Sequence, residues 1–90
     1  MIWWLSFADA AGFRGACCVE AAGDEPHEID ASFRAAITKA NELGINPGGE
    51  VKGAALGGAT PAALAEGGLE LNRLYSKAEL EAIGDGVMKF

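Results

Sequence analysis

The sequence predicts a single α+β domain over residues 1–90: a small two-layer β-β-α-β fold with sheet order 2-1-3, one main helix on one face, and a C-terminal helical segment. Two alternating apolar segments around a short turn predict a hairpin, and one apolar stripe at helical spacing predicts the helix. An apolar stretch behind a Pro-Gly-Gly turn predicts a third strand. Half of the 90 residues are hydrophobic and 22% are charged, a composition that excludes a disordered chain.

The first two predicted strands, residues 2–8 and 13–21, form a hairpin around the three-residue loop Ala10-Ala11-Gly12. This loop places Gly12 at the left-handed position that such hairpins commonly need. It also gives a register in which the apolar partners share one face: Trp3 with Val19, Leu5 with Cys17, and Phe7 with Gly15. A slip of one residue would turn every side chain to the other face, so we expect this register.

The main helix is predicted from Asp30, a good N-cap residue, to Leu43, with Gly44 just after its end. Its apolar stripe consists of Ile29, Phe33, Ile37, Ala40 and Leu43, with Ala36 on the same side. A type II turn at Asn46-Pro47-Gly48-Gly49 then leads into a third strand at Glu50–Leu56. Since the chain reverses at each connection, the third strand runs antiparallel to the first, which becomes the central strand.

The remaining third of the chain is less regular. Thr60 and Pro61 predict a short helix that ends at Gly67-Gly68, because Thr is a good cap and Pro favours the first helical position. Residues 69–75 are compatible with either extended chain or helix. Ser76 to Glu79 has the pattern of a capping box before a last helix, which we expect Gly84 to close.

The sheet face that carries Trp4 has two alternative covers. The C-terminal segment could reach it through Leu74, Leu80 and Ile83, or a second subunit could bury it, because exposed aromatic patches usually mark interfaces. Both accounts are open from the sequence. Because many apolar residues are alanine, the core is thin, and we expect a homo-oligomer, most simply a dimer.

Charge, hydrophobicity and cysteine content argue against several classes of protein: nucleic-acid-binding, secreted, membrane-spanning and disulfide-bonded proteins. The net charge is −6 with no basic run, so we expect no nucleic-acid partner. The N-terminal apolar run breaks at Asp9, too early for a signal peptide or a membrane span. Cys17 and Cys18 are neighbours, and a strand directs their side chains to opposite faces, which disfavours a disulfide between them. We therefore expect the protein to reside in the reducing cytoplasm.

No residue pattern indicates catalysis, a metal site or a cofactor. His27 is the single histidine and lies in an acidic loop between Glu25 and Glu28, where a solvated role is the expectation. Neither cysteine has a cationic neighbour that would activate it, and Cys18 is expected to be the more exposed of the two. The chain is therefore predicted not to be an enzyme.

Six residues are candidates for binding a small anionic ligand: Trp4, Arg14, Asn46, Gly48, Gly49 and Arg73. Consecutive glycines allow backbone N–H groups to converge on an anion, while the two arginines offer charge and Trp4 an aromatic face. Turn chemistry alone also explains the glycines, since this loop follows a helix and precedes a strand, the reverse of a phosphate loop.

Three stretches of the chain carry a resemblance to a known group: Trp4–Ala8, Leu43–Val51 with its LGINPGGEV loop, and Leu71–Leu80. They resemble a group of small hypothetical proteins from bacteria, phages and prophages. The resemblance spans most of the chain but carries over no functional residue. It implies by analogy the setting of small phage accessory proteins, which often bind and disable host immune proteins or capture their nucleotide messengers.

The leading hypothesis from the sequence is a non-enzymatic binding protein of this accessory, anti-defence kind, which sequesters a small nucleotide-like anion between its subunits. The net negative charge argues against this hypothesis, although a local field can override net charge. The alternative is a protein-binding inhibitor that acts on a host protein through an exposed sheet face or sheet edge.

Overall fold

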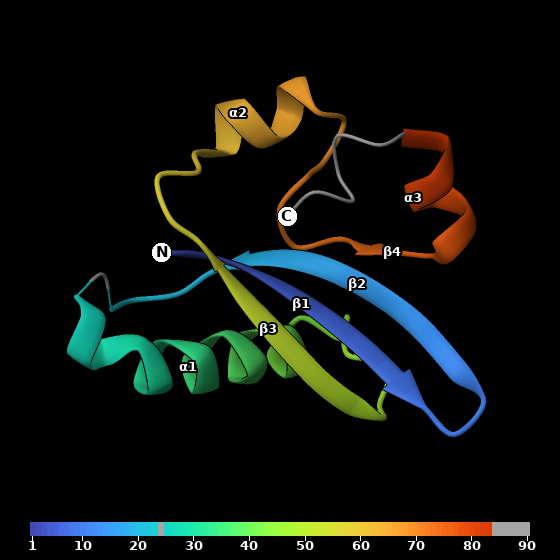
Figure 1. The fold of residues 1–90 in the computed structure, drawn as a ribbon, viewed down its shortest axis with the longest axis horizontal. Helices are drawn as coiled ribbons and strands as arrows, with labels where there is room; N and C mark the ends of the chain where they lie inside the picture. The colour runs from blue at the N-terminus through green and yellow to red at the C-terminus, as the bar shows by residue number, and fades with distance from the viewer. Residues whose placement is uncertain (24, 84–90) are drawn as a thin grey trace.

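The computed structural model describes residues 1–23 and 25–83, which form a four-stranded antiparallel sheet, one main helix and short C-terminal helices (Figure 1). In chain order the elements are β1 (Ile2–Asp9), β2 (Gly12–Glu20), a 3-10 turn η1 (Pro26–Glu28), α1 (Ile29–Glu42), β3 (Glu50–Leu56), α2 (Pro61–Glu66), β4 (Leu74–Tyr75) and α3 (Lys77–Ile83). The strand order is β3-β1-β2-β4. The expected order 2-1-3 is confirmed within it, and β4, beside β2, is an addition that the sequence did not predict.

The hairpin register is confirmed, but its turn is not. Trp3 pairs with Val19, and the following apolar pairs also match the prediction. The turn contains only two residues, because Asp9 pairs with Gly12, and Arg14 is the extra residue of a bulge. Asp9 stabilises this tighter turn, since its Oδ1 accepts a hydrogen bond from the Ala11 N–H at 2.9 Å. The bulge then restores the register that the apolar face requires.

One face of the sheet packs against α1. The fully or nearly fully buried residues of this cluster are Trp3, Leu5, Phe7, Cys17, Val19, Ala36 and Ala40. Small residues on the helix allow its close approach to Trp3, whose Nε1 donates a hydrogen bond to the buried Ser32 Oγ at 2.8 Å. Four residues of the predicted stripe pack in this cluster: Ile29, Phe33, Ala36 and Ala40. Ser32 was not predicted there, and Leu43, expected in the core, is 46% exposed.

The start of α1 was predicted wrongly, whereas its end was predicted correctly. Asp30 is not the N-cap: the helix begins at Ile29 behind the 3-10 turn, and Glu28 occupies the cap position without a side-chain bond. At the other end Gly44 adopts φ +71°, as expected. The Gly44 N–H donates to Asn41 O and the Ile45 N–H to Ala40 O, both at 3.1 Å, which closes the helix in a Schellman motif.

The opposite face is covered by the chain itself. Its cluster of buried residues is Ile2, Ala16, Cys18, Leu56, Leu64, Leu69, Tyr75 and Leu80, with Trp4 and Ile83 packed against it. The C-terminal segment, one of the two covers that the sequence left open, is thus the cover of Trp4. Cys18 is fully buried like Cys17, so the expectation that Cys18 is the more exposed was wrong.

The two capping patterns predicted in the C-terminal third, at Thr60 and at Ser76 with Glu79, are confirmed. Thr60 Oγ1 accepts a hydrogen bond from the Ala63 N–H at 3.1 Å and caps α2. Ser76 and Glu79 form the reciprocal capping box of α3, with bonds of 3.2 and 3.1 Å. The ambiguous stretch before it is extended, with a bridge from Leu71 to Cys18 and then β4. The expected closure of the last helix at Gly84 lies outside the described residues.

Candidate functional site

The two edges of the sheet differ strongly. Beside β2 the chain adds Leu71, Asn72 and the two-residue strand β4, and the Asn72 N–H donates to Cys18 O at 2.8 Å. On the other side β3 is the terminal strand, seven residues long and paired with β1 in a continuous register without a bulge. Natural edges are commonly blunted by bulges, proline or several charges. In β3 the only residues of that kind are Glu50 and Lys52.

An apolar groove runs along this edge on the α1 side. It measures about 490 Å³ and is lined by Trp3, Ile29, Asp30, Phe33, Val51, Lys52 and Gly53. Two of these lining residues are aromatic, Trp3 and Phe33, with ring centroids 5.3 Å apart and planes tilted by 38°. Within β3, Val51, Gly53 and Ala55 lie opposite Phe7, Leu5 and Trp3, which places their side chains on this α1 face.

Gly53 allows α1 to pack closely against β3 beside the groove. A Cβ atom at this position would collide with the ring of Phe33 and lie 3.2 Å from Trp3 Cε3. The missing side chain lets the Phe33 ring lie over the strand while α1 stays close to the sheet. Gly53, Ala54 and Ala55 are all exposed, so the strand presents backbone with little side-chain cover. Within residues 1–23 and 25–83 no strand pairs with the outer side of β3, so this surface offers backbone N–H and C=O groups beside an apolar groove.

The charges at this edge are few and of both signs. Glu50 and Lys52 are exposed and alternate with the half-buried Val51 along β3, and Asp30 contributes a carboxylate at the helix side of the groove. None of these groups is buried. They can therefore fix the register and orientation of a docked strand, whereas the apolar groove would supply most of the contact area.

The predicted anion-binding residues fall into two groups. Near the hairpin turn, Arg14 Nη1 lies 2.7 Å from Asp9 Oδ2, so its charge is already matched by a carboxylate. The loop after α1 lies beside the same turn, because a Cβ atom at Gly49 would clash with Ala8 O and lie 3.4 Å from Asp9 Cβ. The Ala8 carbonyl oxygen at this place carries a partial negative charge, which disfavours binding of an anion beside Gly49.

The glycine loop has a structural role of its own. Gly48 and Gly49 adopt φ +89° and +85°, and the Gly48 N–H donates to Asn46 Oδ1 at 2.8 Å. Asn46 also donates from Nδ2 to Asn41 Oδ1. At least one of the backbone donors expected to face an anion is therefore used within the loop.

Arg73 and Trp4 lie on the C-terminal side of the molecule. Arg73 Nη2 is 2.6 Å from Glu79 Oε2, and its guanidinium carbon stands 4.7 Å from the centre of the Tyr75 ring. Trp4 packs in the cluster under the C-terminal segment. The six predicted residues are thus not brought into one site, and each of the two arginines has a carboxylate partner.

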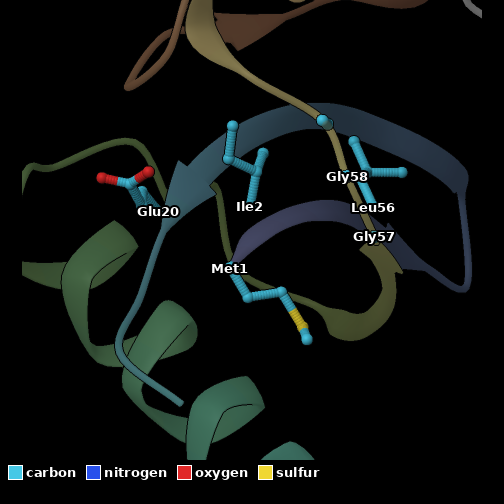
Figure 2. A pocket seen from close by; sticks show the side chains of 7 residues that line it. Met1, Ile2, Glu20, Leu56, Gly57 and Gly58 are labelled. Carbon is cyan, nitrogen blue, oxygen red and sulfur yellow. The ribbon is translucent and has the colours of Figure 1, made fainter. Parts of the chain in front are cut away.

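A second pocket lies where β1 begins and β3 ends (Figure 2). It measures about 330 Å³ and is lined by Met1, Ile2, Glu20, Leu56, Gly57, Gly58 and Ala59. Glu20 is the one charged side chain in this lining, and Figure 2 shows it at one end, apart from Met1 and Leu56. The Met1 ammonium group beside this pocket donates a hydrogen bond to Ala21 O at 2.9 Å.

The residues considered for catalysis have the following environments. Burial raises the pKa of the Cys17 thiol to about 11 and that of Cys18 to about 12, which suppresses the thiolate. His27 is exposed, with Nε2 3.6 Å from Glu28 Oε1. Within residues 1–23 and 25–83, no cluster of three or more His, Cys, Asp or Glu side chains is arranged to hold a metal ion.

Sequence reasoning named the sheet edge only in general terms and missed the groove. The signal was available in part, since Glu50–Leu56 was correctly predicted as a strand and its Gly-Ala-Ala core is unusually small. No described helix is long and apolar enough to cross a membrane. Comparison with protein families, curated proteins and solved structures finds no match to the chain.

Proposed function

We propose that this protein is a non-enzymatic binding module that docks an extended segment of a partner protein along the free edge of β3. The partner segment adds a strand to the sheet, and its alternate side chains enter the groove between β3 and α1. This is β-strand addition, in which main-chain hydrogen bonds supply affinity and side-chain pockets supply specificity. The resemblance to small phage and bacterial proteins makes a host protein the expected partner.

The observation that carries the proposal is the combination of a regular, exposed terminal strand with an apolar groove directly beside it. Trp3 and Phe33 are among the residues that line the groove, and aromatic residues dominate the energy of many interfaces. An exposed edge without several charges or a bulge is a template for another strand. A chain that keeps such an edge is expected to use it.

Capture of a small anion stays a prediction from the sequence. An anion would compete with the carboxylates of Asp9 and Glu79 for Arg14 and Arg73, and it would bind against a net charge of −6.

A peptide-display selection tests the proposal. The full chain is immobilised and short random peptides are selected, which we expect to show apolar residues at alternate positions. Binding of a selected peptide should slow amide hydrogen exchange in residues 50–56 more than in α2 or α3. Ala55→Lys, which places a charged side chain on the groove face of the edge, should weaken binding by at least about tenfold.

Ala35→Lys is the matched control, because Ala35 is also an exposed alanine but lies on α1 outside the groove lining. It should leave peptide affinity unchanged. Selected peptides that protect other segments, or that bind Ala55→Lys as well as the unaltered chain, would refute the β3 edge as the docking site.

A further inference from the structure

We infer that the strand which occupies the β3 edge in the free protein is β3 of a second copy, paired antiparallel about a two-fold axis at Val51. This inference rests on the proposed function, since it names a partner for the same edge. The dimer would join two sheets into one and would cover both grooves until another strand competes for them.

Symmetry limits the ways in which two β3 strands can pair. In an antiparallel pair related by a two-fold axis normal to the sheet, one residue lies opposite its own copy, and the flanking residues are paired accordingly. An axis at Glu50 opposes two glutamates, and an axis at Lys52 opposes two lysines. An axis at Val51 places Glu50 of each copy opposite Lys52 of the other, which forms two opposite-charge pairs.

The main helices favour the same axis over one at Gly53. Figure 1 shows α1 extending beyond β3 on the side away from β1, and Phe33 of this helix lies over Gly53. An axis at Gly53 would bring both Phe33 rings to the same level on the same face. With the axis at Val51, the two Gly53 levels are four residues apart, roughly 13 Å. The two helices then cross the paired strands at different levels, whereas an axis at Gly53 would bring them to the same level.

The apolar contacts agree with this register. Val51 is half-buried and lines the groove of its own chain. At the axis its side chain would lie beside the same side chain of the partner copy, and the pair would close the mouths of both grooves. Charge complementarity sets the register, and the shared apolar contact is what self-association would bury.

Sedimentation velocity of the full chain over a range of concentrations tests the inference by charge reversal. The unaltered chain should form a dimer whose dissociation constant rises with salt concentration. Lys52→Glu, which opposes glutamates in both pairs, should weaken the dimer by about tenfold or more. The double exchange Glu50→Lys with Lys52→Glu recreates both pairs in reverse and should restore most of the affinity.

Lys77→Glu is the control, because it makes the same charge change at an exposed position on α3. It should leave the dimer intact, and circular dichroism should show that all variants are folded. A chain that stays monomeric at the highest concentration, a dimer unaffected by Lys52→Glu, or a double exchange that fails to restore it would each overturn the inference.

The selected peptides separate this inference from the proposed function. A competing peptide should dissociate the dimer, which supports both. Peptides that protect β3 in a monomeric chain would overturn self-pairing and leave strand capture standing. A dimer that obeys the charge-reversal pattern but binds no peptide would refute capture of a foreign strand while self-pairing holds.

Discussion

Gly53 shows how one missing side chain shapes the surface of this protein. Its φ is not in the left-handed region, so alanine is acceptable to the backbone, but a Cβ atom would meet Phe33 and Trp3. We expect Gly53→Ala to lower the free energy of unfolding by about 1–3 kcal/mol through overpacking. Urea denaturation measures this cost. In a Phe33→Leu background the same substitution should cost less, and equal costs in both would contradict the clash.

Ser32 is a second residue whose role depends on its exact neighbours. It is the buried polar residue of the helix face, and its Oγ accepts the Trp3 Nε1–H bond at 2.8 Å. Ser32→Ala would leave a buried indole N–H without its partner, which should cost about 1–3 kcal/mol of stability. Thermal or urea unfolding measures the loss. Ser32→Ala should cost less in a Trp3→Phe chain, where no indole N–H needs a partner.

At the scale of elements, two exposed carboxylates secure a turn and a helix start. The Ala11 N–H, followed by Arg14, holds the pKa of Asp9 below its ordinary 3.8. Backbone and side-chain bonds from Ser76, followed by Arg73, hold the pKa of Glu79 below 4.5. Because folding lowers both values, the stabilisation is complete above the ordinary pKa values and is lost as the pH falls through the lowered, folded-state values.

Urea unfolding from neutral pH down to about pH 3 measures this acid limb. Asp9→Asn and Glu79→Gln should each make the fall in stability with decreasing pH shallower, because each removes one linked group. Glu66→Gln is a suitable control, since Glu66 lies exposed at the end of α2. If the free energy of unfolding falls with decreasing pH as steeply in both test variants as in the unaltered chain, these bonds do not contribute to stability.

For the whole molecule, the two cysteines report on cooperative opening. Cys17 and Cys18 face opposite clusters, and burial raises both thiol pKa values. We expect a disulfide reagent to label neither thiol in the native protein at about pH 8, and both together in urea. Rapid labelling of Cys18 alone would show that the C-terminal cover opens separately from the α1 side.

The same cysteines test the absence of thiol chemistry that the sequence predicts. Replacing Cys17 and Cys18 together by alanine should leave peptide binding to β3 largely intact, although stability should fall because buried groups become smaller. Binding is measured with the selected peptides and stability by urea unfolding. Lost binding in a variant that keeps its fold would point to a thiol-dependent site.

The local sequence by itself determined the elements whose signals are short-range. Alternation of apolar residues set the hairpin register, Gly44 the end of α1, and Ser76 with Glu79 the start of α3. Each of these depends on residues a few positions apart or on a pattern of period two, so no distant contact was needed. The turn at Ala10-Ala11 escaped prediction because a bulge can be exchanged for a loop residue without changing the register.

Only the tertiary structure decided which surfaces are covered. Whether the C-terminal segment reaches Trp4 depends on the path of residues 57–75, whose extended stretch pairs with β2 through backbone bonds that carry no sequence signature. The packing of α1 on the sheet depends on how closely Ser32 and Ala36 let the helix approach Trp3. The exposed edge and groove at β3 follow from these two packings. Which surface stays exposed is decided only once the other apolar faces are packed against one another.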